Sequence, residues 1–302
     1  MTFEIASIVA SPWLIISWGI LIGLVFSTVG AAGGILASFG LITLFGVQNP
    51  NLVKPTAQAL TLLTPLIALP VYFKQCRLVI SLALLLGAGG IVGAVIGSSL
   101  SIRYLSNMDT FKPAFGALVI LIAIQISWRV LHHSRKKSSA ADRASHNFEE
   151  SIHLGKMPCD LGVKKQSCSV KYFSFEFGAE NFSFNPLLPF FTGLGIAIVS
   201  SALGVGGGFL LVPFMSSIMR LPMFIIAATA AMAIAMSSVT SIANYLRLGV
   251  EMDWPLLAYL SVGVIAGSFA GPVVSQYFRE SWLRAILGAI LFFIGLRYVS
   301  LL

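Results

Sequence analysis

Long apolar segments separated by short polar turns run along almost the whole chain. We read ten of them, at about 12–30, 34–46, 53–72, 78–101, 111–131, 186–204, 208–219, 222–246, 254–278 and 282–300. Most come close to the roughly 20 residues that a helix needs to cross about 30 Å of hydrocarbon. A β-barrel would instead show short alternating segments. The pattern predicts an all-α, polytopic helical membrane protein, with boundaries good to about two to four residues.

Two of these segments, 34–46 and 208–219, are short. At about 1.5 Å per residue, each reaches only about 20 Å, which is less than the thickness of the bilayer core. Either each short segment crosses the membrane like its neighbours, or each dips into the bilayer and returns.

The first five segments and the last five resemble each other at a nearly constant offset. The motif GAAGGILASF at 30–39 aligns with GVGGGFLLVP at 204–213, and YFK at 72–74 aligns with YLR at 245–247. Glycines spaced four apart also align, namely Gly89, Gly93 and Gly97 with Gly263, Gly267 and Gly271. Such agreement over a whole half predicts an internal duplication.

The duplication divides the chain into a first transmembrane repeat, 1–131, a hydrophilic loop, 132–185, and a second transmembrane repeat, 186–302. An odd number of crossings per repeat would turn the second copy upside down. The loop is rich in lysine and arginine, which places it in the cytoplasm. If all ten segments cross, the basic residues of the short loops divide five inside to four outside. If the short segments dip, the division is three to six, so the inverted arrangement fits better, with both termini outside.

Composition agrees with lipid as the solvent. Charged residues make up 10% of the chain, against about 25% in an ordinary soluble domain, and hydrophobic residues make up 57%. The net charge of +8 reports membrane orientation here, not nucleic-acid binding. The first residues include Glu4 and no lysine or arginine, which is unlike a signal peptide. Three cysteines give no disulfide framework.

The hydrophilic loop holds all four histidines and two of the three cysteines. His146, His153, Cys159 and Cys168 are a conceivable metal site, but their spacing matches no standard zinc pattern. We expect a solvated, partly disordered linker and no bound metal or cofactor. The end of the loop, KYFSFEFGAENFSFNP at 171–186, alternates aromatic residues around a turn. This predicts a small hairpin or an aromatic patch at the membrane surface.

The most unusual stretch is 204–208, where four of five residues are glycine in the middle of an apolar run. A nucleotide-binding loop is excluded, because the stretch lacks the sixth-position glycine of a dinucleotide fingerprint and the Gly-Lys-Ser/Thr of a P-loop. Close helix packing is a second interpretation, and it suffices for the glycines spaced four apart. Each glycine costs a helix about 1 kcal/mol, however, and Pro213 follows. The density of glycine therefore favours a third interpretation, a break in the helix.

A broken helix within lipid must line a cavity or pack against protein, because unsatisfied amides there are costly. The new helix would begin near Gly208, with free N–H groups and the positive end of its dipole at the break. Such an end binds anions without a basic side chain. Gly33 and Gly34 repeat the pattern in the first copy. Two breaks meeting near mid-membrane would form a pseudo-symmetric anion pocket.

We predict a substrate-binding set from the glycines at the breaks and from nearby hydroxyls, which can donate to an oxyanion. Thr56 and Thr229 are included because they align between the copies, although a hydroxyl often only bonds a carbonyl of its own helix. The set is Gly30, Gly33, Gly34, Thr28, Thr56, Gly204, Gly206, Gly207, Gly208, Ser201 and Thr229.

Ionisable side chains are not expected deep in any segment, which argues against a proton relay. The sequence instead indicates facilitated movement of an anion down its own gradient and the membrane potential. An embedded enzyme is not expected, because no nucleophile and base pair occurs in the spans.

Two stretches resemble a known family closely. GVGGGFLLVPFM at 204–215, followed by AATAAMAIAMSSVTSIANYLRLGVEMDW at 227–254, is similar to the second-repeat motif of the TauE/SafE sulfite exporter family. The resemblance covers nearly all of the chain except 131–185. It implies a multi-pass protein of the cell membrane that moves sulfite and small organosulfur anions such as sulfoacetate, usually outward. Two features depart from it: the first motif has no proline, and the middle loop is long.

An alternative function belongs to another class. The protein would then be a membrane-embedded scaffold or sensor that acts through the hydrophilic loop 132–185, and not a transporter.

Overall fold

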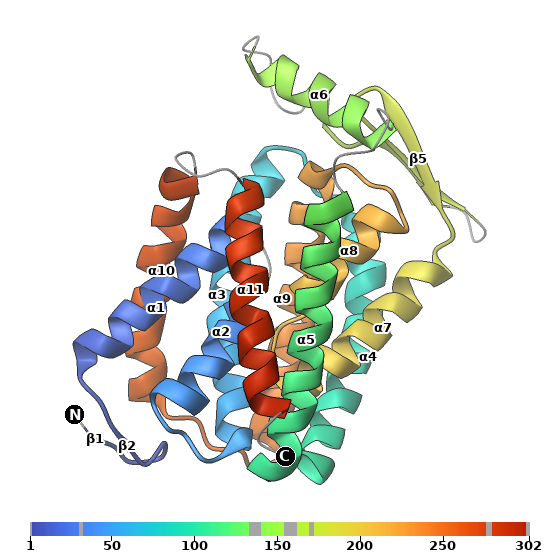
Figure 1. The fold of residues 1–302 in the computed structure, drawn as a ribbon. Helices are drawn as coiled ribbons and strands as arrows, with labels where there is room; N and C mark the ends of the chain where they lie inside the picture. Colours follow the sequence, from blue (N-terminus) through green and yellow to red (C-terminus); the bar gives the residue numbers. More distant parts are fainter. Residues whose placement is uncertain are drawn as a thin grey trace.

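The computed structural model describes residues 2–29, 33–132, 140–153, 162–168, 172–275 and 280–299. The first half of the helical bundle contains α1 (Pro12–Val29), α2 (Gly33–Phe39) with its continuation as a π-helix, η1 (Gly40–Leu44), then α3 (Pro50–Lys74), α4 (Ile80–Tyr104) and α5 (Met108–His132). The second half contains α7 (Leu187–Leu203), α8 (Gly208–Ser217), α9 (Met223–Arg247), α10 (Trp254–Ser275) and α11 (Glu280–Val299). All ten predicted apolar segments are therefore helical, as Figure 1 shows.

Four of the described helical stretches are long and apolar enough to cross a membrane. They are α3, α4, α9 and the part of α5 from Met108 to Ile126. The remaining apolar helices are shorter over the residues described. The expectation of a helical membrane protein is thus consistent with the lengths and composition of these helices.

Helices α1 and α2 fold back on each other as a hairpin. Trp18 Nε1 donates to the carbonyl oxygen of Leu36 at 3.3 Å, and the ring of Phe26 lies over Gly33. Helices α7 and α8 do the same, with Gly207 facing Ser200 one turn before the end of α7. The sequence left open whether the short segments cross the membrane or dip into it, but in both cases it expected α1 and α7, the helices before them, to cross the bundle. Each pair is instead one hairpin that enters and leaves at the same end.

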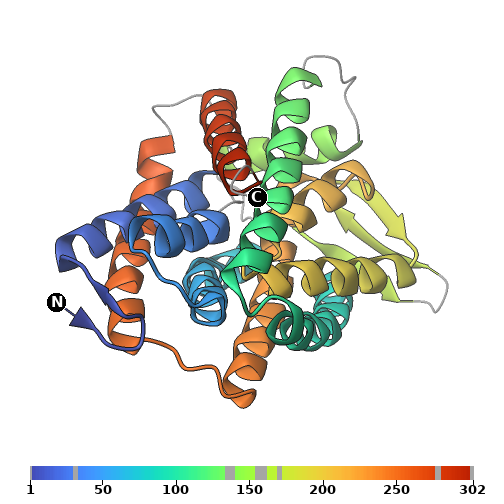
Figure 2. The same ribbon diagram turned by 60° about the horizontal axis from the view of Figure 1, so that its bottom comes forward.

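Each hairpin packs against a long helix of the other half. A Cβ on Gly19 of α1 would lie 2.5 Å from the carbonyl oxygen of Leu260 in α10. A Cβ on Gly193 of α7 would lie 2.2 Å from the carbonyl oxygen of Leu86 in α4. These glycines allow backbones to touch, as the packing interpretation of spaced glycines expects. The two contacts involve positions that the sequence aligned, and in each a helix of one half packs against a helix of the other half (Figure 2).

The segment between the halves folds as a small module. It consists of α6 (Ala140–His153) and an antiparallel sheet of β3 (Lys164–Cys168), β4 (Phe173–Phe177) and β5 (Glu180–Phe184) in the order β3-β4-β5. The predicted hairpin is confirmed, because β4 pairs with β5 around the Gly178–Ala179 turn. The expectation of a partly disordered linker is wrong for the described residues, since alternate phenylalanines of β4 are buried. A second, two-stranded sheet, β1 (Thr2–Phe3) with β2 (Ile8–Val9), precedes α1.

The module sits on one end of the bundle (Figure 1). Arg77, between α3 and α4, places its guanidinium carbon 4.3 Å from the ring centre of Phe224. The Phe224 ring in turn packs at a tilt against Phe148 of α6, with 5.4 Å between the ring centres. Burial lowers the pKa of Arg77 from its ordinary value. The Val163 N–H donates to the carbonyl oxygen of Cys76 at 2.8 Å. Cys76 is also disulfide-bonded, although the sequence predicted no disulfide framework.

The opposite end of the bundle holds the start of α1 and the end of α11 (Figures 1 and 2). There α5 and α11 run antiparallel, with Gly116 beside Tyr298 and Gly295 beside Ile120. The bundle therefore has a module end and a terminal end, and the two hairpins enter from opposite ends.

Candidate functional site

The glycine stretch 204–208 breaks the helix. Helix α7 ends at Leu203 and α8 begins at Gly208. Between them Gly204 has φ 71° and Gly206 has φ 75°, a backbone conformation that residues with a Cβ rarely adopt. Packing alone therefore does not account for this stretch, and the interpretation as a break is the one that the backbone follows.

Neighbouring helices satisfy the carbonyl end of α7. The Tyr245 hydroxyl donates to the carbonyl oxygen of Ser201 at 2.9 Å, and Ser101 Oγ donates to that of Ala202 at 2.7 Å. Gln58 Nε2 of α3 also lies 3.4 Å from the carbonyl oxygen of Ser201. Side chains of three helices thus replace the hydrogen bonds that the break removes, which is how a break is tolerated inside an apolar bundle.

The amide end of α8 is left unsatisfied. The first hydrogen bonds of this helix run from the N–H groups of Leu210 and Leu211 to the carbonyl oxygen of Gly207. The N–H groups of residues 206–209 donate to no acceptor within the described ranges, and all four residues are buried. Buried free amides at the positive end of a helix dipole are able to bind a negatively charged oxygen.

A small cavity of about 10 Å³ adjoins this helix end. Gly207, Ser200 and Ser237 line it together with apolar residues of α4, α7, α8 and α9. This volume accepts the centre of one water molecule and is too small for an oxyanion. A ligand of that size would therefore need the surrounding helices to separate.

The first hairpin brings its own glycines to the same place. A Cβ on Gly34 would lie 1.8 Å from the carbonyl oxygen of Val205, so the two hairpin tips touch. Thr61 of α3 lies between them, with its Oγ1 2.9 Å from a Cβ built on Gly206. Thr61 is close to the middle of α3, so the tips meet near mid-bundle, as the sequence predicted for the two breaks.

Most of the predicted substrate-binding set lies at these tips. Gly33, Gly34, Gly204, Gly206, Gly207, Gly208 and Ser201 are there. Gly30 lies outside the described residues, and so does the side chain of Thr28.

The two aligned threonines lie elsewhere. Thr56 Oγ1 donates to the carbonyl oxygen of Leu52 in its own helix at 2.7 Å. Thr229 Oγ1 accepts from the N–H of Val79 at 3.4 Å, which places it at the start of α4. The hydroxyls of these two aligned positions are thus engaged with backbone groups, in the same helix for Thr56 and in another helix for Thr229.

Sequence reasoning placed Lys54 in a loop, whereas the structure places it in α3 with no exposed surface. Because Lys54 lies near the start of α3, it does not contradict the expectation that no ionisable side chain lies deep in a segment, but its burial was not predicted. Lys54, Gln58 and Thr61 are spaced four and three apart, which puts them on one face of α3. That spacing was visible in the sequence and would have indicated a polar stripe.

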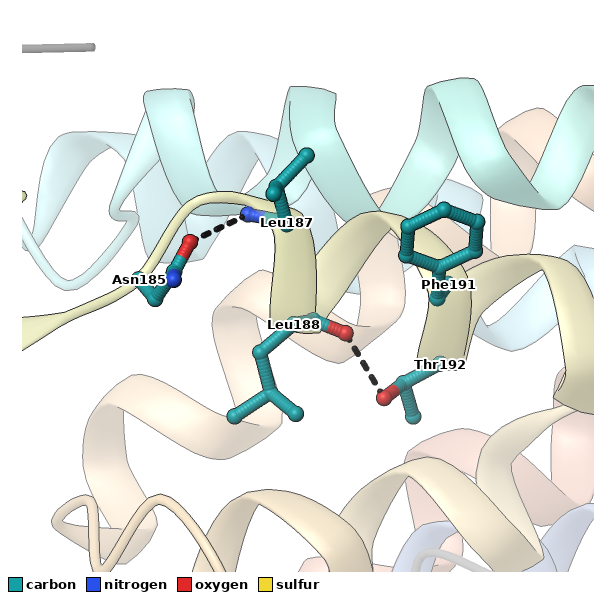
Figure 3. Close-up of a pocket in the computed structure, with 5 residues that line it drawn as sticks. All are labelled: Asn185, Leu187, Leu188, Phe191 and Thr192. Atoms are coloured by element: carbon teal, nitrogen blue, oxygen red, sulfur yellow. Dashed lines mark hydrogen bonds between the residues drawn. The ribbon is translucent and has the colours of Figure 1, made fainter. Parts of the chain in front are cut away.

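A wider hollow, of about 540 Å³, lies away from the tips at the start of α7. Figure 3 shows it lined by Asn185, Leu187, Leu188, Phe191 and Thr192. Its polar atoms are occupied, since Asn185 Oδ1 accepts from the Leu187 N–H and Thr192 Oγ1 donates to the Leu188 carbonyl. We therefore do not assign an anion site to this surface.

Comparison with known proteins gives two matches. The sequence profile of the family described as sulfite exporter TauE/SafE matches residues 15–298. A protein of Bacillus subtilis (strain 168), named probable membrane transporter protein YunE, is 23% identical over 296 residues, which are 95% of this chain and 96% of that protein. No solved structure is significantly similar to this chain.

Proposed function

This chain belongs to the sulfite exporter TauE/SafE family, and from that premise we propose that it exports a small sulfur-containing anion across the cell membrane. The anion is of the sulfite or organosulfonate class. It binds where the two hairpin tips meet and crosses by alternating access. The named function of the Bacillus subtilis relative, a probable membrane transporter, agrees with this proposal.

The free amide end of α8 carries the proposal. Its N–H groups at 206–209 are buried without acceptors in the described part of the chain, beside a cavity that Ser200 and Ser237 line. Amides and hydroxyls donate to an oxyanion without adding a buried charge. They release a weakly held ligand more easily than a fixed ion pair would.

The arrangement of the halves supports alternating access. Each half contributes one hairpin and three helices that run between the two ends of the bundle (Figure 1). An odd number of crossings makes the halves inverted copies. If a movement of one hairpin opens the site towards the module end, the same movement of the other hairpin opens it towards the terminal end. The matched contacts of Gly19 and Gly193 support this equivalence. The closed cavity is then the intermediate between two open states.

We place the module in the cytoplasm and both ends of the chain outside, on the basic residues of 132–185. The inside-negative potential then favours anion exit by about 2.3 kcal/mol per charge per 100 mV. Disulfides do not persist in a reducing cytoplasm, so the Cys76 bond should be open in the cell. A thiol reagent that crosses membranes should label Cys76 in intact cells, whereas an impermeant reagent should not. A Cys76 that an impermeant reagent labels, but only after a reductant has been added, would reverse the orientation.

Transport by the purified protein tests the proposal. In proteoliposomes, the full-length chain should move labelled sulfite, thiosulfate or sulfoacetate in preference to sulfate. Gly207→Leu should abolish that flux while the protein still inserts, because the side chain fills the cavity beside the free amides. Gly195→Leu is a matched control on α7, since no atom lies within 4 Å of a Cβ there. Normal flux in Gly207→Leu would refute the role of the break.

The module favours a second candidate, a sensor. Its phenylalanines share one apolar core with Leu211 and Met215 of α8, so a ligand on the module would act on the helix that carries the free amides. Deleting 140–185 separates the two functions. A transporter keeps its flux in vesicles without the module, whereas a sensor loses its response.

A further inference from the structure

Lys54 is a charged side chain without exposed surface inside an apolar bundle. Its Nζ donates to the carbonyl oxygen of Leu105 at 2.6 Å and to Asn51 Oδ1 at 3.2 Å, and it lies 5.1 Å from the ring centre of Phe111. These partners are neutral. In the part of the chain that the structure describes, no carboxylate pairs with this ammonium.

A buried charge without a counter-ion is strongly unfavourable, so proteins rarely keep one for structure alone. The bond to Leu105 does cap the end of α4, but a neutral donor would do this without the cost of the charge. The uncompensated charge therefore requires another reason.

The position of Lys54 connects it with the hairpin tips. A Cβ on Gly204 would lie 2.5 Å from the Lys54 Cα, so the backbones touch at the break. Gln58 and Thr61, on the same face of α3, contact the second hairpin. Lys54 lies about 10 Å along α3 from Thr61, towards the terminal end. Between them, the Oε1 atom of Gln58 is buried and has no hydrogen-bond partner.

From this geometry, and resting on the proposed function, we propose that Lys54 is the counter-charge of the transported anion on the terminal-end side of the site. The anion passes from the amides of α8 to the ammonium of Lys54 along the face of α3 that carries Gln58. The first half alone supplies this charge, since the aligned position in α9 is Ala227. The two halves therefore do not contribute equally to the path.

The neighbour Asn51 allows a test that keeps Lys54 in place. Asn51→Asp puts a carboxylate of the same shape 3.2 Å from Nζ, so the ammonium gains an internal counter-ion and keeps its bond to Leu105. If Lys54 serves the anion, flux of labelled sulfite in proteoliposomes should fall about 30-fold or more. If Lys54 only caps α4, Asn51→Asp should transport normally and be at least as stable as the wild type.

Three further variants complete the experiment. Lys54→Met should lose flux as Asn51→Asp does, and Lys54→Arg should restore part of it. Asn51→Ala removes one hydrogen bond and keeps the charge, so it should transport normally. Thermal unfolding in detergent reports whether each variant is folded, and Asn51→Asp decides the question if Lys54→Met does not fold.

The outcomes separate the two proposals. A wild-type protein that moves none of the sulfur anions would refute the proposed function itself. A wild-type protein that transports, together with an Asn51→Asp variant that transports equally well, would overturn the role of Lys54 and leave the proposed function standing.

Discussion

The two hairpins have aligned sequences and different interiors. In the first, Phe26 lies over Gly33, and its ring fills the angle between α1 and α2. In the second, the residue aligned with Phe26 is Ser200, and a cavity remains beside Gly207. Helix α8 has ten residues, whereas α2 has seven before it becomes a π-helix. A ring therefore packs inside the first hairpin where a hydroxyl lines the cavity of the second, and we infer that the second hairpin binds the anion while the first closes against it.

The largest expected effect comes from the contact between the hairpins. Gly34→Ala would place a Cβ 1.8 Å from the Val205 carbonyl oxygen, and this backbone does not yield as a flexible side chain would. We expect a loss of about 3 kcal/mol of stability, or failure to fold. Thermal unfolding in detergent measures it.

Gly195→Ala in the second hairpin is the control for this substitution. Nothing lies within 4 Å of its Cβ, and alanine is the better helix former, so it should be neutral or stabilising by up to about 1 kcal/mol. Equal stability of Gly34→Ala and Gly195→Ala would mean that the tips do not touch as described.

Removing the ring from the first hairpin should separate stability from transport. Phe26→Ala leaves a cavity over Gly33 and should cost about 2 kcal/mol, because the ring is only partly buried. Flux should persist, since the free amides belong to the other hairpin. The measurement is flux per folded protein, and complete loss of flux would show that the first tip takes part in binding.

Filling the cavity of the second hairpin should lower flux without lowering stability, the reverse of the result expected for Phe26→Ala. At Gly207 φ is −73°, and the nearest atom to a Cβ is 3.5 Å away, so alanine fits without strain. Gly207→Ala should unfold at about the wild-type temperature and lower the flux about tenfold, because the methyl group displaces the ligand from the amides. A stable variant with unchanged flux would contradict the assignment of the site.

The smallest expected effects are those of Thr64→Ala and Ser237→Ala, which change aligned positions in α3 and α9. The hydroxyls of Thr64 and Ser268 form a hydrogen bond of 3.1 Å, so Thr64→Ala should cost about 1 kcal/mol of stability and leave flux unchanged. Ser237 lines the cavity, and its hydroxyl donates to its own helix at Ile234. Ser237→Ala should leave stability unchanged and lower flux a few-fold. Identical behaviour of the two variants would remove the distinction between the halves.

Much of this arrangement could be predicted from the sequence. The apolar segments became helices within a few residues of the predicted limits, and the glycines at 204–208 became a break, because helix formation and its interruption depend on local residues. The hairpin at 171–186 followed from alternating aromatics. Repeated glycine motifs marked the positions where backbones touch.

The errors concern contacts between distant segments. The sequence did not show that α1 and α7 turn back instead of crossing, because length and hydropathy are similar for a crossing helix and for one arm of a hairpin. It placed Lys54 in a loop, since burial depends on α4 and α5 closing over it. The sequence also led us to expect a linker, whereas α6 and the sheet pack on a surface formed by α4, α8 and α9.

By itself, the sequence determined the apolar character of the protein, its helices, the break at 204–208 and the family to which the chain belongs, because these depend on composition and neighbouring residues. Only the tertiary structure decided that the tips of two hairpins meet at Gly34 and Val205, that Ser200 lines a cavity and that the ring of Phe26 lies over Gly33. It also decided that a lysine with no carboxylate partner among the described residues lies beside the break. These features arise where residues far apart in the chain share a volume, and local patterns carry no information about that volume.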